Sequence, residues 1–399
     1  MLLSALQAMT NRRTGRLAWT CLALGLASLT TCVGLLAQQA PFRAGVELVA
    51  LDVTVLDSRR RPVTGLAAAD FRVTVDGRDV PIASFAAVTG ATAVDDAGTP
   101  RPNAGPGAVP AASADAAGDS GRVLILLFDR SIPAGEPTTR ARSIARAVVE
   151  SAGADDHIAI VRSSGFSGEG ASVEPTRDRQ ALLAEIDAPF TGIVAVAQMS
   201  SSGLQARPPD LFLTGDCLCG VCVFDALEHV ARAVEHESRK KMLFFIGSDI
   251  VVQERPSDPT QCQPAIRDGR TRMLRALDEA NLTVHAFDTL GIQSLASGAQ
   301  TSAADALPGG NLGRPAMSRN LERHGNLAVL PDFTGGRTVL NTSTPEAAVP
   351  DVLAETSSYY VIGIERDAAV DPRKVRAVRV RVDRRGLTVR SRTGYFGRQ

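Results

Sequence analysis

Two uninterrupted apolar runs lie in the middle of the chain: Val123–Phe128 and Met242–Ile246. Their residues do not alternate with polar ones, which predicts strands buried on both faces, as in a parallel sheet covered by helices. We expect a third buried strand at Leu282–Phe287. Apolar residues with helical spacing lie between the runs, most clearly in Thr138–Glu150. Alternating helices and buried strands predict an α/β fold with a doubly wound, mostly parallel sheet.

The same periodicities predict further elements around these strands. They are a strand at His157–Val161, a turn and strand at Thr334–Leu340, and helices at Arg177–Ile186, Phe224–Val234, Arg270–Ala280 and Pro345–Ala354. Residues 189–221 and 291–318 show neither periodicity, so we expect loops there.

Strands of a different kind are predicted at both ends of the chain. Phe71–Val75 alternates apolar and polar residues and ends in the turn signal Asp76-Gly77. Val378–Val382 alternates in the same way, and residues 384–386 turn into Leu387–Arg390, which predicts a hairpin with one buried and one charged face. We expect the late strands to complete the early module, with the α/β domain inserted between them.

These patterns suggest a division of the chain into five parts. Residues 91–120 consist largely of Ala, Gly, Pro, Asp and Ser, which bury too little apolar surface to fold, so they predict a flexible linker. The predicted parts are a signal peptide at 1–40, an N-terminal β module at 41–90, the linker at 91–120, the α/β domain at 121–356 and C-terminal strands at 357–399.

The N-terminus has the features of a secretory signal peptide. Arg12, Arg13 and Arg16 precede an apolar run at Leu17–Ala37 that ends in small residues. An uncleaved anchor is the alternative, because the run approaches the roughly 20 residues that span a bilayer. Residues 29–32 also faintly suggest a lipoprotein cleavage site. We therefore expect an exported protein, periplasmic, extracellular or associated with the envelope, with no transmembrane segment in the mature chain.

Composition and motifs narrow the class of function. The 399 residues contain 43 basic and 43 acidic side chains, so the chain as a whole has no electrostatic footprint for nucleic acid. The sequence also contains no nucleophile elbow, phosphate loop, zinc-protease motif or dinucleotide fingerprint. We therefore expect a protein that is not an enzyme.

Candidate metal ligands follow two of the buried runs. Asp129 and Ser131 come after the first run, and Asp249 comes after the second. Ligands of open α/β sheets bind at the carboxyl ends of the strands, so these oxygens are expected at one edge of the sheet. Carboxylates and hydroxyls suit a hard cation such as Mg²⁺.

Several short motifs occur in a characteristic order and spacing along the chain. They are Val63-Thr64-Gly65-Leu66, Asp70-Phe71, Asp76-Gly77, Thr334-Gly335-Gly336-Arg337, Ser358-Tyr359-Tyr360-Val361-Ile362-Gly363 and Arg392-Thr393-Gly394-Tyr395-Phe396. In this order and spacing the chain resembles the von Willebrand factor A-related exported proteins of acidobacteria. The resemblance covers most of the mature chain and implies a von Willebrand factor A-like, Rossmann-type α/β domain.

The resemblance also implies a metal-ion-dependent adhesion site in a degenerate form. Asp129, Ser131 and Asp249 match the family's Asp-x-Ser and its later Asp. Pro133 replaces the second Ser, and Cys222 replaces the Thr; a thiol is a poor ligand for a hard cation. Mg²⁺ or Mn²⁺ is therefore the implied ion, at a site that has lost part of its ligand set.

Four cysteines remain outside the targeting segment: Cys217, Cys219, Cys222 and Cys262. An even number in an exported protein predicts disulfides, with three possible pairings. Tetrahedral zinc is the alternative that four thiolates allow. We expect Cys262 to reach the earlier trio, and a bonded Cys222 would close the position of the missing Thr.

Together these features predict an exported protein of adhesion or scaffolding type. Its α/β domain would present loops at the strand ends to a partner, which we expect to be a protein. A structural component of the cell envelope without a metal site is the main alternative. A metal-dependent hydrolase that uses Asp129 and Asp249 is a weaker one, because no general base or nucleophile is positioned by the sequence.

Overall fold

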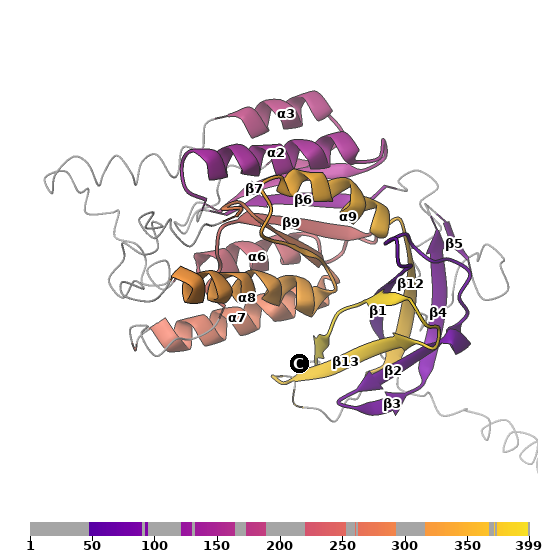
Figure 1. Cartoon of the computed structure of the whole chain (residues 1–399). Coiled ribbons are helices and arrows are strands. Elements are labelled where there is room, and N and C mark those ends of the chain that lie inside the picture. The colour runs from indigo at the N-terminus through magenta and orange to yellow at the C-terminus, as the bar shows by residue number, and fades with distance from the viewer. Residues whose placement is uncertain are drawn as a thin grey trace, which may run out of the picture. The chain divides into compact units, whose positions relative to one another are not determined.

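The computed structural model of the chain (Figure 1) describes residues 48–89, 92–94, 121–129, 132–163, 173–188, 220–252, 260, 262–292, 316–366, 371 and 373–397. The chain divides into two units between Val46 and Glu47, and all described residues belong to the second. The predicted signal peptide lies outside the described residues, as do Ser131, Cys217 and Cys219.

A six-stranded sheet forms the centre of the α/β part, in the order β11-β10-β9-β6-β7-β8. The strands from β11 to β7 run parallel, and β8 pairs antiparallel with β7. The mostly parallel sheet agrees with the prediction. Its strands are β6 (Val123–Phe128), β7 (His157–Arg162), β8 (Val173–Thr176), β9 (Lys241–Gly247), β10 (Thr283–Asp288) and β11 (Thr338–Val339).

Helices cover both faces of this sheet, α2, α3 and α9 on one side and α6, α7 and α8 on the other (Figure 1). β6 shows why its apolar run does not alternate: Leu124 and Leu126 belong to one core, and Ile125 and Leu127 belong to the other. The bounds are α2 (Glu136–Ser151), α3 (Arg179–Asp187), α6 (Cys222–Ala233), α7 (Cys262–Glu279), α8 (Ala316–Thr334), η3 (Pro345–Ala348) and α9 (Val349–Glu355).

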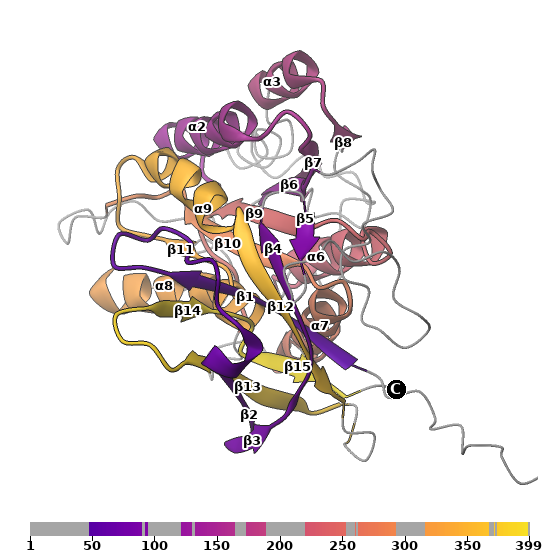
Figure 2. The ribbon, with the colours of Figure 1, turned by 90° about the vertical axis from the view of Figure 1, so that its right-hand side faces the viewer.

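Two antiparallel sheets combine strands from both ends of the described chain, in the orders β14-β1-β12-β4-β5 and β15-β13-β2-β3. Figure 2 shows β12 between β1 and β4. Both sheets bury residues in a third core. The elements are β1 (Leu48–Leu56), η1 (Ala68–Asp70), β2 (Phe71–Val75), β3 (Arg78–Val80), β4 (Ile82–Thr89), β5 (Thr92–Val94), β12 (Ser358–Glu365), β13 (Val375–Val382), β14 (Thr388–Arg390) and β15 (Gly394–Phe396).

The predicted hairpin of Val378–Val382 with Leu387–Arg390 is wrong. β13 pairs with β2 and β15, whereas β14 pairs with β1 in the other sheet. Alternation determines which face of a strand is buried, but it does not determine the partner. The partners here are N-terminal strands, which no local turn signal could identify.

Three other expectations need correction. β5 forms inside the segment that was predicted to be a linker, while residues 95–120 lie outside the described residues. α7 begins at Cys262, eight residues before the predicted start. α8 has no counterpart among the predicted elements and begins within the expected loop at 291–318; its internal Gly325 and Pro331 weaken a helical pattern in sequence.

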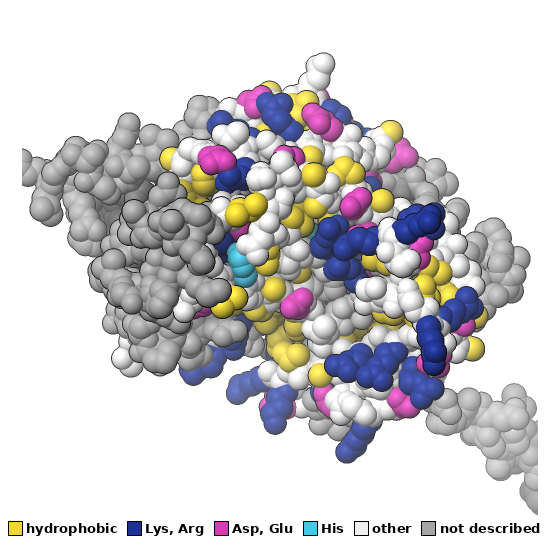
Figure 3. Space-filling view, viewed as in Figure 1, with side chains coloured by type: hydrophobic (Ala, Val, Ile, Leu, Met, Phe, Trp, Pro, Cys, Tyr) yellow, Lys and Arg dark blue, Asp and Glu magenta, His cyan; other side chains and the backbone are white. Residues whose placement is uncertain are grey.

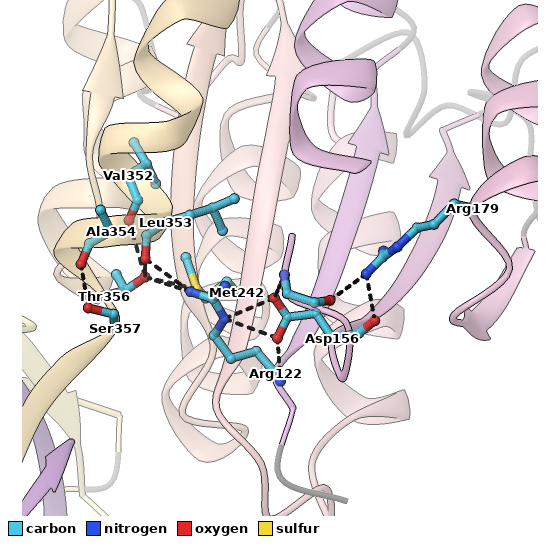
Figure 4. A network of polar contacts seen from close by, with 10 residues as sticks. Arg122, Asp156, Arg179, Met242, Val352, Leu353, Ala354, Thr356 and Ser357 are labelled. Carbon is cyan, nitrogen blue, oxygen red and sulfur yellow. Dashed lines mark hydrogen bonds and ion pairs between the residues drawn. The ribbon is translucent and has the colours of Figure 1, made fainter. Parts of the chain in front are cut away.

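The edge of the parallel sheet where β6 and β7 begin is held by a charged network (Figure 4). Arg122 forms an ion pair with Asp156 at 2.7 Å, and its Nη1 donates to the carbonyl of Leu353 at 3.0 Å. Burial alone would raise the pKa of Asp156, but the hydrogen bond and charge of Arg122 outweigh it and hold the pKa below its usual value. Arg122 thus fastens the end of α9 to the start of the central strand.

A tyrosine joins the two ends of the described chain. The Tyr360 hydroxyl, from β12, accepts a hydrogen bond from the Leu66 N–H at 3.1 Å and donates one to the Val63 carbonyl at 2.8 Å. Its ring lies 5.0 Å from that of Phe71 and 5.6 Å from that of Phe85, measured between centroids. One C-terminal side chain therefore fixes an N-terminal loop and packs against two N-terminal strands.

No helix within these ranges is long and apolar enough to cross a membrane.

We expect Tyr360→Phe to lower the free energy of unfolding by about 1 to 3 kcal/mol, because a buried N–H and a carbonyl lose their partner. Urea denaturation measures this. Tyr359→Phe is the matched control. It removes the hydroxyl oxygen of the preceding residue, which forms no hydrogen bond within the described part of the chain. Equal effects of the two substitutions would show that the hydrogen bonds of the Tyr360 hydroxyl do not contribute to the free energy of unfolding.

Candidate functional site

The carboxyl ends of three neighbouring parallel strands bring polar side chains to one edge of the sheet. Asp129 follows β6, Ser248 and Asp249 follow β9, and Asp288 ends β10 before Thr289. The register pairs Phe128 with Ile246, and the Asp129 N–H donates to the Ile246 carbonyl at 2.9 Å. We call the five residues Asp129, Ser248, Asp249, Asp288 and Thr289 the strand-end edge.

Asp129 is held in a tight position between strands. It is 5% exposed, and its Oδ1 accepts a hydrogen bond from the Ser163 hydroxyl at 3.0 Å, at the end of β7. Gly247 lies beside it on β9: a Cβ there would be 3.1 Å from the Asp129 Cβ and 2.7 Å from the Phe245 ring. Glycine at this position therefore lets the carboxylate lie against the neighbouring strand.

Asp249 is the more accessible of the two predicted acids, since its burial is only intermediate. Its Oδ1 accepts a hydrogen bond from the Ile250 N–H at 2.8 Å and one from the Asn326 Nδ2 of α8 at 3.4 Å. These bonds orient the carboxylate at the end of β9. The sequence could not indicate Asn326, because α8 was not among the predicted elements.

The third acid, Asp288, is neutralised by a buried arginine. Asp288 is 1% exposed, and its Oδ1 accepts from the Arg323 Nη1 of α8 at 2.6 Å. The same Arg323 nitrogen lies 3.1 Å from the Ser248 carbonyl, so one guanidinium binds the ends of β9 and β10 together. His324 lies beside this pair, and burial together with the charge of Arg323 lowers its pKa. The neutral form of His324 is therefore favoured.

Hydroxyl groups complete the buried side of the strand-end edge. The hydroxyls of Ser248 and Thr289 lie 2.9 Å apart, and the Thr289 N–H donates to the Gly247 carbonyl at 3.0 Å. From α2, the Arg140 Nη1 donates to the carbonyls of Thr289 and Leu290 at 3.1 and 3.0 Å. The loop that follows β10 is thus bound by α2, which covers the opposite face of the sheet from α8.

The structure places only part of the predicted metal ligand set. Asp129 and Asp249 lie at the ends of neighbouring strands, while Ser131 is outside the described residues. Pro133 contributes a backbone carbonyl that accepts the Thr138 hydroxyl at 2.8 Å. Mg²⁺ binding by these residues stays a prediction.

Two of the four predicted cysteines are described, each as the first residue of a helix: Cys222 begins α6 and Cys262 begins α7. Sulfur is a poor ligand for a hard cation, so Cys222 does not replace the missing Thr oxygen. The disulfides, and their connectivity with Cys217 and Cys219, stay predictions.

The oxygen donors at the strand-end edge do not meet the needs of a divalent cation. Mg²⁺ prefers about six oxygen ligands in octahedral geometry. Across the described ranges, no group of three or more His, Cys, Asp or Glu is arranged to hold a metal ion. The two predicted carboxylates already accept hydrogen bonds from Ser163, Ile250 and Asn326. The described residues therefore do not form a complete metal site.

Comparisons with known proteins do not assign the chain to a family. No family model matches the chain, and no curated protein matches it. Among solved structures, the pilus adhesin SpaC from Lactobacillus rhamnosus GG has 9% identity and a TM-score of 0.30, over 68% of this chain and 44% of the adhesin. A von Willebrand factor type A protein from Catenulispora acidiphila has 11% identity and a TM-score of 0.31, over 90% of this chain and 76% of that one.

The chain therefore spans less than half the length of the adhesin. Similarities at these TM-scores carry no argument about function. Membership of the von Willebrand factor A family, which the sequence motifs imply, stays a prediction.

Arg323→Met should destabilise the protein by about 3 to 5 kcal/mol, because it leaves the buried Asp288 carboxylate without its cation. Arg272→Met is the control: Arg272 is 54% exposed and pairs with Asp225 and Glu228 at 3.4 Å, and such pairs contribute about 0 to 1 kcal/mol. Chemical denaturation compares the two. The double variant Arg323→Met/Asp288→Asn should recover part of the loss, and a cost of Arg323→Met no larger than that of the control would contradict the proposed role of the pair.

Proposed function

We propose that this chain is an exported protein that binds another protein through the strand-end edge, in an adhesion or scaffolding role. The observation that carries the proposal is the position of exposed apolar side chains. The large hydrophobic residues exposed within the described ranges are Ile292, Leu321 and Val375. Ile292 lies four residues after Asp288, and Leu321 lies two residues before Arg323. Ile292 and Leu321 therefore belong to the two segments that hold the edge, the loop after β10 and helix α8. Exposed apolar groups among polar ones are typical of protein interfaces.

The frame itself supports binding rather than catalysis. Asp129 and Asp288 are almost fully buried and hydrogen-bonded, to Ser163 and Arg323 respectively. A general base or nucleophile needs access to its substrate, which buried, hydrogen-bonded acids do not have. The edge therefore supports a surface whose loops are held in place, and we propose no enzymatic activity.

Chemical crosslinking followed by capture from envelope extracts tests the proposal. We expect Ile292→Asp and Leu321→Asp to lose a protein that the wild type captures, because a charge in an apolar contact must be desolvated. Val375→Asp is the matched control, since Val375 is also exposed but lies on β13. If all three variants capture the same proteins as the wild type, the strand-end edge is not the binding surface. The alternative of a structural component of the cell envelope is then favoured.

We propose that a divalent cation contributes at most weakly to this surface, held by Asp129, Ser131 and Asp249. A cation with a millimolar dissociation constant, present in tenfold excess, would stabilise the folded state by about 1.4 kcal/mol. That corresponds to a rise in melting temperature of about 2 to 4 °C. We expect Mg²⁺ and Mn²⁺ to cause no rise of this size. A rise in the wild type that Asp249→Asn abolishes would establish a working cation site.

We also propose that disulfides hold the starts of α6 and α7, with Cys217 and Cys219 as the partners of Cys222 and Cys262. Support comes from the positions of Cys222 and Cys262, which are the first residues of α6 and α7. Such bonds would restrain two helices that pack on the same face of the sheet. The intact mass of the unreduced protein, before and after alkylation, counts the free thiols; any alkylated cysteine among the four contradicts the proposal.

A further inference from the structure

A cavity of about 860 Å³ lies away from the strand-end edge, lined by residues of β2, β13, β14 and the end of α8. Lys and Arg side chains gather over the β13 region on the visible face (Figure 3). We call the charged residues of this cavity the arginine groove: Arg72, Arg379, Arg381 and Arg390, together with Asp79 and Asp332.

The positive charge of the groove is poorly compensated. Arg381 lies directly opposite Arg72 in the register of β13 with β2, and like charges in that position destabilise a sheet. Arg379 and Arg381 are exposed, and neither has a hydrogen bond or ion pair with any described residue. Arg72 has only long contacts, at 3.7 Å to Asp79 and 3.5 Å to Asp383. An anionic ligand would relieve this repulsion.

The opposite wall of the groove is fixed by its own contacts. The Arg390 Nη1 donates to the Gly336 carbonyl at 2.8 Å, and the Thr393 hydroxyl donates to the Asp332 carbonyl at 2.9 Å. Gly335 has φ +84°, and a Cβ there would be 2.7 Å from the Ser391 carbonyl carbon. The close approach at this turn thus requires glycine. A wall held in this way is preorganised, which reduces the cost of binding.

We propose that the arginine groove binds an extended acidic polypeptide with carboxylates at alternate residues. Arg379 and Arg381 are two residues apart on one face of a strand, which places them about 7 Å apart. Alternate side chains of an extended peptide repeat at the same spacing, and each guanidinium can take one carboxylate in a bidentate pair. Acidic polysaccharide fits less well, because the lining residues include no aromatic ring on which a sugar could pack.

Fluorescence anisotropy with the full chain tests this binding. The probe is a labelled decapeptide of alternating Glu and Thr, and its control has the same composition with all glutamates in one run. We expect the alternating peptide to bind more tightly, and Arg379→Gln/Arg381→Gln to weaken its binding by about tenfold or more, the loss expected for two charge-assisted contacts.

The matched variant is Arg373→Gln/Arg385→Gln, which removes two exposed arginines that do not line the cavity. It should retain the affinity of the wild type within about threefold, as expected for charges that act only at a distance in water. Asp249→Ala should also bind the peptide normally, because this surface is separate from the strand-end edge. Circular dichroism confirms that each variant is folded.

Three results would overturn the proposal. Equal losses in the two double variants would reduce the binding to non-specific charge attraction. Equal affinities for the alternating peptide and for the control peptide with its glutamates in one run would show that the spacing of the carboxylates does not matter. Tighter binding of polygalacturonate than of the alternating peptide would assign the groove to acidic polysaccharide.

Discussion

The parallel pairing of β6 with β9 is the contact on which both the α/β part and the candidate site depend. These strands are separated by more than a hundred residues in sequence, yet every residue of β6 has a partner on β9. The pairing buries β6 between two cores and brings Asp129 and Asp249 to the same edge. A shift of register by one residue would exchange the residues that face the two cores, so packing fixes the position of the acids.

The antiparallel strands depend on contacts with the same scaffold. Asp52 of β1 forms an ion pair with Lys240, just before β9, and accepts a hydrogen bond from Asn281 at 3.3 Å. Burial would raise the pKa of Asp52, but Lys240 outweighs it and the pKa is lowered. Asp278 of α7 is likewise buried with Arg392, and its Oδ2 accepts the N–H of Phe396 at 2.9 Å. The last strand is thus tied to a helix of the α/β part.

The two proposed binding surfaces use opposite physical strategies. At the strand-end edge Asp288 is buried and paired with Arg323, and exposed apolar residues lie on the segments that hold this edge. In the arginine groove, Arg379 and Arg381 are exposed, and neither forms an ion pair with any described residue. The first arrangement suits an apolar contact that needs a rigid frame, while the second suits an anionic chain.

The amino-acid pattern by itself determined the strands of the central sheet other than β8, the burial of β6 and the position of Asp129 and Asp249 at strand ends. It could do so because periodicity reports burial, and burial in a helix-covered sheet constrains where ligand-bearing loops lie. Only the tertiary structure decided the partners of β13 and β14, which are N-terminal strands. It also decided the place of Arg323 and Asn326, which lie on a helix that the sequence does not signal. Such contacts join residues far apart in the chain, and no local pattern encodes which distant surface they meet.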